Sequence, residues 1–134
     1  MKIIYIIALI PTLIICYMSV LDLINIYLFE ESKQLCKITN RLRIPFGYES
    51  ISALTLILIF LHIIYSIIFE DNTILLSNVV ECLLNLSETS LLFILFKLID
   101  KQSIFIKFLY LFAAFTFIMA TKGYFYKIIV GLSQ

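Results

Sequence analysis

Charged residues are scarce in this chain: they make up 14% of its 134 residues, whereas 63% are hydrophobic. Soluble domains contain about 25% charged residues and about 45–50% apolar ones. A soluble fold of this length has too little interior to hide so many Ile, Leu and Phe side chains. The excess apolar surface must therefore face lipid. The net charge of +1, with basic residues that form no patch, gives no indication of a nucleic-acid partner.

Glycine, cysteine and histidine are also rare, with three, three and one residues respectively. The sequence has no glycine-rich phosphate loop and no nucleophile–base pair, so we expect no self-contained catalytic site and no cofactor. One histidine and three distant cysteines (Cys16, Cys36 and Cys82) do not provide the roughly four ligands that zinc needs. An odd cysteine count also argues against a disulfide framework. We therefore expect no metal site and three free or buried thiols.

Four apolar runs are long enough to cross a bilayer, whose core of about 30 Å needs about 20 helical residues. They cover residues 3–29, 51–69, 74–97 and 104–130. Only helices or closed barrels satisfy the backbone in lipid, and these runs lack the alternation of barrel strands. The sequence therefore predicts an all-α integral membrane bundle of four transmembrane helices, a single domain over residues 1–134. The first run is too long for a signal peptide and no small-residue cleavage site follows it.

The connections indicate how the helices pair. Residues 70–73 form a tight link, which predicts an antiparallel hairpin of the second and third helices, and residues 100–103 form another. Residues 30–50 are the only long connection, and Pro45-Phe46-Gly47 reads as a turn before the second helix. Most Lys and Arg residues lie in the first and third loops. The positive-inside rule therefore places both termini away from the cytoplasm or matrix.

Polar side chains follow one face of the third helix. Their spacings of three, four and seven residues place them on the same side. The face consists of Ser77, Asn78, Glu81, Asn85, Glu88 and Thr89. A charge in mid-membrane costs about 2.5 kcal/mol or more, so both carboxyls must face protein or water, or be protonated. We interpret Glu81 and Glu88 as a candidate proton path, with Ser77, Asn78 and Asn85 as supporting groups. The alternative is that these residues only hydrogen-bond a neighbouring helix.

The remaining polar residues within the runs favour structural interpretations. His62, in the middle of the second helix, reads as a helix–helix hydrogen-bonding residue, with proton relay as the sharper alternative. Lys122 either snorkels to the interface or pairs with one of the glutamates. Asp22 and Asn25 share a face near the end of the first helix and are expected at the membrane interface.

The region around Glu81 resembles a known family. Residues 72–85, NTILLSNVVECLLN, are similar to the second helix of the chain 4L (NuoK-type) subunit of respiratory NADH:quinone oxidoreductase, complex I. That helix has an Asn at the preceding loop, a long apolar run, and a Glu followed four residues later by Asn. Asn72, Glu81 and Asn85 match in type and spacing. The family's second glutamate, in its third helix, has no counterpart in residues 111–116, and Glu88 or a partner subunit is the candidate to replace it.

The resemblance implies a small core subunit of the membrane arm of complex I. Glu81 would then belong to the chain of membrane carboxyls that links quinone reduction to proton translocation. The implied partners are other transmembrane subunits within the lipid bilayer. The abundant residue types have AT-rich codons, which suits a mitochondrial genome. The expected location is therefore the mitochondrial inner membrane, with a bacterial inner membrane as the alternative.

Two other functions fit the same sequence. One is a structural or accessory transmembrane subunit of another respiratory or membrane assembly, in which the polar face only fixes helix packing. The other is a small bacterial or phage membrane protein of the immunity or holin type. Enzymatic activity is expected only as part of a proton-translocating NADH:ubiquinone oxidoreductase.

Overall fold

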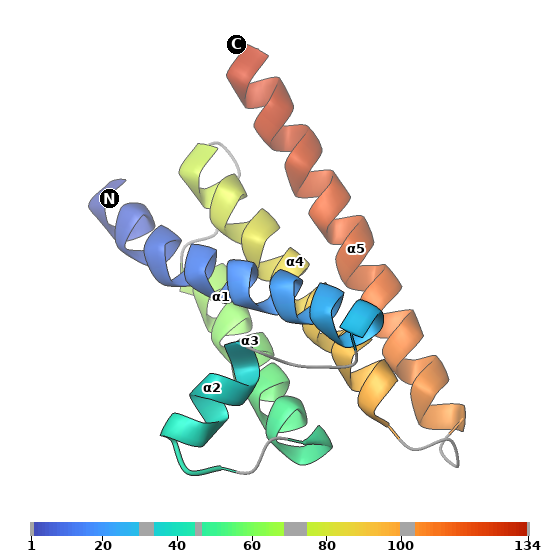
Figure 1. The fold of residues 1–134 in the computed structure, drawn as a ribbon. Helices are drawn as coiled ribbons and strands as arrows, with labels where there is room; N and C mark the ends of the chain where they lie inside the picture. Colours follow the sequence, from blue (N-terminus) through green and yellow to red (C-terminus); the bar gives the residue numbers. More distant parts are fainter. Residues whose placement is uncertain (1, 30–33, 45–46, 69–74, 100–103, 134) are drawn as a thin grey trace.

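A computed structural model describes residues 2–29, 34–44, 47–68, 75–99 and 104–133, and all its regular structure is helical (Figure 1). The helices are α1 (Lys2–Phe29), α2 (Gln34–Arg41), α3 (Tyr48–Ile68), α4 (Leu75–Leu98) and α5 (Ile104–Ser133). Four of them, all but α2, are long and apolar enough to span a membrane. This confirms the prediction of an all-α membrane bundle with four spans. The turn signal at Pro45 and Phe46 and the links that contain Asn72 and Asp100 lie outside the described residues.

Helix α4 is the centre of the bundle. It packs against α1, α3 and α5, whereas the other three spans make little contact with one another. Within its most apolar stretch 72% of the residues are buried, compared with 22% in α1, 17% in α3 and 6% in α5. Figure 1 shows α3 and α4 running in opposite directions, as predicted for a hairpin. The polar face predicted for the third span lies on α4 and is therefore surrounded by protein.

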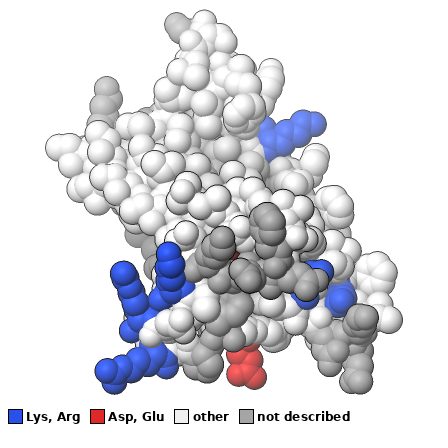
Figure 2. All heavy atoms as spheres, in the orientation of Figure 1, with Lys and Arg blue, Asp and Glu red and all other residues white. Residues whose placement is uncertain are grey.

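The outer surface of the bundle is apolar. Large side chains on α3 and α5 are almost fully exposed, including Ile67 at 74%, Phe105 at 74% and Phe112 at 75%. In Figure 2 uncharged atoms cover the middle of the molecule and most charged groups lie toward its lower end. An apolar surface of this extent marks contact with a membrane or a partner. Together with the four spans, it identifies an integral membrane protein.

Helix α5 touches the rest of the protein along one narrow strip. Its only buried residue is Ala114, with 1% of its surface exposed, and its small side chain lets the α5 backbone approach α4 closely. Cys82 of α4 also donates a weak hydrogen bond to the carbonyl of Thr121, at 3.7 Å. Most of α5 therefore faces lipid or another subunit.

The long connection contains a short helix, α2, that hydropathy does not reveal. Asp22 of α1 accepts hydrogen bonds from the backbone N–H groups of Gln34 (2.9 Å) and Leu35 (2.5 Å), the first two residues of α2. Such bonds satisfy donors that a helix N-terminus otherwise leaves unpaired. Asp22 is fully buried, because its carboxylate lies between α1 and the start of α2. Its side chain fixes α2 against the end of α1.

Candidate functional site

One imidazole connects the two glutamates of the central helix. His62 of α3 places Nε2 at 2.5 Å from Glu81 Oε2, while its Nδ1 contacts Glu88 Oε1. Glu81 and Glu88 are seven residues apart, so they share a face of α4 about 10 Å apart along its axis. The two ring nitrogens point in different directions, which lets a single ring bridge carboxyls separated by two helical turns. We call these three residues the Glu81–His62–Glu88 relay.

The protonation of the relay follows from the donor inventory of its members. A neutral imidazole has one N–H, so it can donate to only one carboxylate; the second hydrogen bond then requires a protonated carboxyl or an imidazolium. The state with an imidazolium and two carboxylates holds the same number of protons as the state with a neutral ring and one protonated carboxyl. A proton can therefore shift between Glu81, His62 and Glu88 without breaking either hydrogen bond.

The two glutamates differ in their second oxygen. Glu81 Oε1 accepts a hydrogen bond from the Ser66 hydroxyl at 2.8 Å, so both oxygens of Glu81 are paired. Glu88 is fully buried, and its Oε2 has no hydrogen-bond partner among the described residues. A buried acceptor left unpaired costs about 1–3 kcal/mol. Glu88 Oε2 is therefore the atom of the relay on which an additional proton or a water molecule removes the largest penalty.

Several other polar residues of α4 hydrogen-bond within their own helix. The amide of Asn85 donates to the Glu81 carbonyl at 2.8 Å, and Thr89 donates to the Asn85 carbonyl at 2.8 Å. Ser87 and Ser90 also bond to carbonyls one turn earlier in α4. Ser77 and Asn78 are buried near the start of α4. Glu81 and Glu88 are thus hydrogen-bonded to Ser66 and His62 of α3, and Ser77 lies beside Tyr65 of the same helix.

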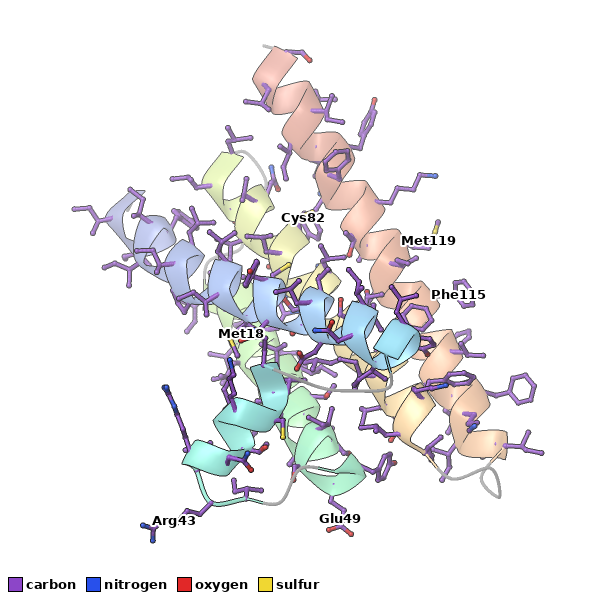
Figure 3. The ribbon with its side chains drawn as sticks, in the orientation of Figure 1. Met18, Arg43, Glu49, Cys82, Phe115 and Met119 are labelled. Atoms are coloured by element: carbon purple, nitrogen blue, oxygen red, sulfur yellow. The ribbon has the colours of Figure 1, made fainter. Side chains whose placement is uncertain are left out.

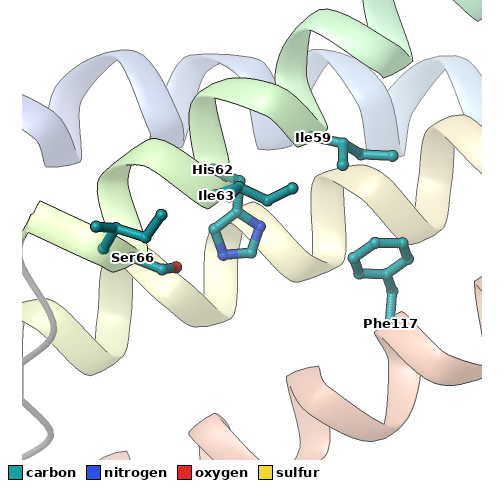
Figure 4. A pocket seen from close by; sticks show the side chains of 6 residues that line it. Ile59, His62, Ile63, Ser66 and Phe117 are labelled. Carbon is teal, nitrogen blue, oxygen red and sulfur yellow. The ribbon is translucent and has the colours of Figure 1, made fainter.

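A recess of about 360 Å³ opens beside His62, between α3 and α5. Its walls are apolar, with Ile59, Ile63 and Ile67 on α3 and Phe117 on α5, as Figure 4 shows for most of them. The only polar groups that line it are His62 and Ser66. The His62 side chain is 11% exposed, whereas that of Glu88 is 0% exposed. The relay is therefore approachable at its histidine and closed at Glu88.

The structure brings the two predicted proton carriers together on His62, which forms the helix–helix hydrogen bonds that the sequence predicted for it. The available signal was its position: a lone imidazole at mid-helix, opposite two carboxyls in the next span. Lys122, the other predicted partner, is exposed and forms no ion pair with either glutamate in the described part of the chain.

The relay does not have the geometry of a metal centre. No group of three His, Cys, Asp or Glu residues among those described could hold a metal ion. The physical reason is that Glu81 and Glu88 contact different nitrogens of the same ring, so their carboxylates diverge instead of converging on one point. The geometry suits the transfer of a proton along the three groups.

A search of protein-family models, curated proteins and solved structures finds no match to this chain.

Proposed function

We propose that this chain is a transmembrane subunit that carries protons through the Glu81–His62–Glu88 relay. The observation that supports the proposal is the contact of one imidazole with both carboxyls inside the bundle. Ionisable residues inside a membrane are costly and are typical of proton pathways. Histidine suits the central position because it can accept a proton at one nitrogen while it releases another at the second.

The proposed transfer proceeds in one concerted or two successive steps. A proton on Glu81 Oε2 moves to His62 Nε2, and the proton on His62 Nδ1 moves to Glu88 Oε1. Glu81 becomes a carboxylate, Glu88 becomes a carboxylic acid, and the neutral ring has changed tautomer. A second transfer in the same direction requires the ring to turn over or its proton to return. The relay therefore passes one proton per reorganisation of His62.

The length of the relay argues for additional groups from a partner. Glu81 and Glu88 span about 10 Å along the helix axis, against a membrane core of about 30 Å. Helix α5 contains no acidic residue, and most of its surface faces outward. The remaining distance is best covered by water or by polar groups of other subunits, so we place the chain in a larger membrane assembly.

The narrower proposal is that this assembly is respiratory complex I and that the chain acts as its chain 4L-type subunit in the mitochondrial inner membrane. It rests on the similarity of residues 72–85 to that family's second helix and on the AT-rich composition. The family's third-helix glutamate is absent here. Phe115 of α5 is 60% exposed and points away from the bundle (Figure 3). Glu88 supplies the second carboxyl from α4 instead.

A structural role is the second candidate, and one observation favours it. Helix α3 packs mainly on α4 and only 17% of its most apolar stretch is buried. The bonds from His62 to Glu81 and Glu88 therefore contribute much of what fixes its rotation. In this account the three residues form a clamp and no proton moves through them.

Proton translocation by the native assembly distinguishes the two roles. The assembly is purified with Glu81→Gln in place, reconstituted in vesicles, and assayed with a pH-sensitive dye. We expect translocation to fall to background while the variant still co-migrates with its partners on a native gel, because Gln keeps the shape of Glu but neither releases nor takes up a proton. Ser90→Ala, which removes a buried hydroxyl that donates to the Leu86 carbonyl of its own helix, is the control. Unchanged translocation in Glu81→Gln would leave the clamp as the better account.

The same gel tests the narrower proposal independently. Mass spectrometry of the co-migrating proteins is expected to identify NADH-oxidising and quinone-reducing subunits. Co-migration with unrelated proteins would refute the complex I assignment without affecting the relay.

A further inference from the structure

A second cavity lies at the other side of α3, under the short helix. It measures about 290 Å³ and is lined by residues of α1, α2, α3 and α4. Its walls are apolar apart from Ser19 and include Met18 of α1, Leu35 and Ile38 of α2, and Leu54 and Leu58 of α3. Helices α1 and α3 both pack on α4 but hardly touch each other, which leaves the groove between them. Its volume is near the lower limit of about 300 Å³ for small-molecule sites.

Cations border this groove at the end of the bundle that holds α2. Lys37 and Arg41 lie on α2 and Arg43 follows it, and all three side chains are exposed. Arg41 is three residues after Ile38, so its stem starts on the side of α2 that faces the groove. In Figure 3 Met18 lies where α1 faces α2, and Arg43 extends outward at the lower end. Figure 2 shows basic groups gathered at this end of the molecule.

These cations form no salt bridge with another described residue. The ion pairs found in the described part of the chain involve only His62, and the exposed Glu49 does not pair with the three cations. Leu42 and Ile44, beside them, are also exposed, at 64% and 44%. Alternating cationic and apolar groups on a short amphipathic helix are typical of segments that lie in the headgroup region of a membrane.

We propose that the α1–α2–α3 groove binds one acyl chain of an anionic phospholipid whose phosphate is held by Lys37, Arg41 and Arg43. The apolar lining selects a hydrocarbon chain and the unpaired cations select a negative headgroup over a zwitterionic one. Asp22 takes part as a positioning residue, because its hydrogen bonds to Gln34 and Leu35 hold α2 over the groove.

Native mass spectrometry of the full chain, released from micelles that contain phosphatidylglycerol or phosphatidylcholine with the same acyl chains, tests this site. We expect phosphatidylglycerol to remain bound in preference to phosphatidylcholine. Each basic residue near a membrane surface contributes about a fivefold gain in affinity for anionic lipid. Lys37→Gln/Arg41→Gln is therefore expected to reduce retained phosphatidylglycerol strongly, whereas Lys122→Gln/Lys127→Gln, an equal charge loss on α5, leaves it unchanged.

A second variant tests the groove itself. Leu54 lines the groove and is 38% exposed, so Leu54→Trp is expected to fill the space without disturbing the core, and to lower retention of both lipids. Equal retention of the two lipids by the native chain would overturn the proposal, as would equal losses in the two charge variants. A lipid-free dimer that protects the groove would show that a second copy of the chain occupies it instead.

Discussion

His62 determines the state of two carboxyls at once, so its removal affects more than one hydrogen bond. In His62→Leu both Glu81 and Glu88 remain buried without their partner. Breaking a buried ion pair by removing one member costs about 3–5 kcal/mol. We expect this variant to unfold at a much lower denaturant concentration in mixed micelles than Leu56→Ala, which truncates a lipid-facing side chain of the same helix.

A triple variant, in which all three relay residues are replaced by Leu, is the comparison for His62→Leu. Replacing all members of a buried ionic cluster by apolar residues often leaves the stability of a protein unchanged or increases it. We therefore expect His62→Leu/Glu81→Leu/Glu88→Leu to recover the stability lost in His62→Leu while proton translocation stays absent. A stable triple variant that still translocates protons would contradict the relay.

The candidate site was predictable in part at the residue scale. The separation of seven residues places Glu81 and Glu88 on one face of α4, whatever the arrangement of the other helices. Which side chain meets them depends on the rotation of α3 about its own axis, and an apolar helix with little periodicity does not encode that rotation. The same holds for Asp22, whose partners on α2 are backbone N–H groups that any sequence would supply.

At the scale of elements, α2 depends on a side chain outside itself. An eight-residue helix is too short to be stable alone, so the bonds from Asp22 to its N-terminus contribute substantially to its formation. We expect Asp22→Ala to cost about 1 kcal/mol, as loss of an N-cap residue typically does. Hydrogen exchange of the Gln34 and Leu35 amides measures the effect directly. They should exchange faster in Asp22→Ala and change little in Asp22→Asn, which keeps an acceptor oxygen; protected amides in Asp22→Ala would show that other contacts hold α2.

The four long helices were predictable from hydropathy because lipid demands long apolar runs with internal hydrogen bonding. Their ends shifted by a few residues: α3 starts at Tyr48 instead of 51, and α5 continues to Ser133 instead of 130. Helix α2 could not be found in this way because its burial is confined to Leu35 and Thr39. A hydropathy window averages away the amphipathic spacing of α2. It also does not register the Asp22 carboxylate, which lies in another helix.

For the whole molecule, four alternating spans place the two termini on one side of the membrane and α2 on the other. In a variant whose native cysteines are replaced by alanine, we expect a membrane-impermeant maleimide to label Ser133→Cys and Asn40→Cys from opposite sides of sealed vesicles. Both positions are exposed. Labelling of both from the same side would contradict the arrangement of four spans.

The relay itself can be observed without mutation because His62 is the only histidine in the chain. Solid-state NMR of the ¹⁵N-histidine-labelled protein in lipid therefore reports on one residue. We expect both ring nitrogens to be hydrogen-bonded, and their protonation state to exchange as the pH on either side of the membrane is changed. A single fixed neutral tautomer at every pH, with no exchange, would contradict proton transfer through His62 and leave the Glu81–His62–Glu88 cluster as a clamp between two helices.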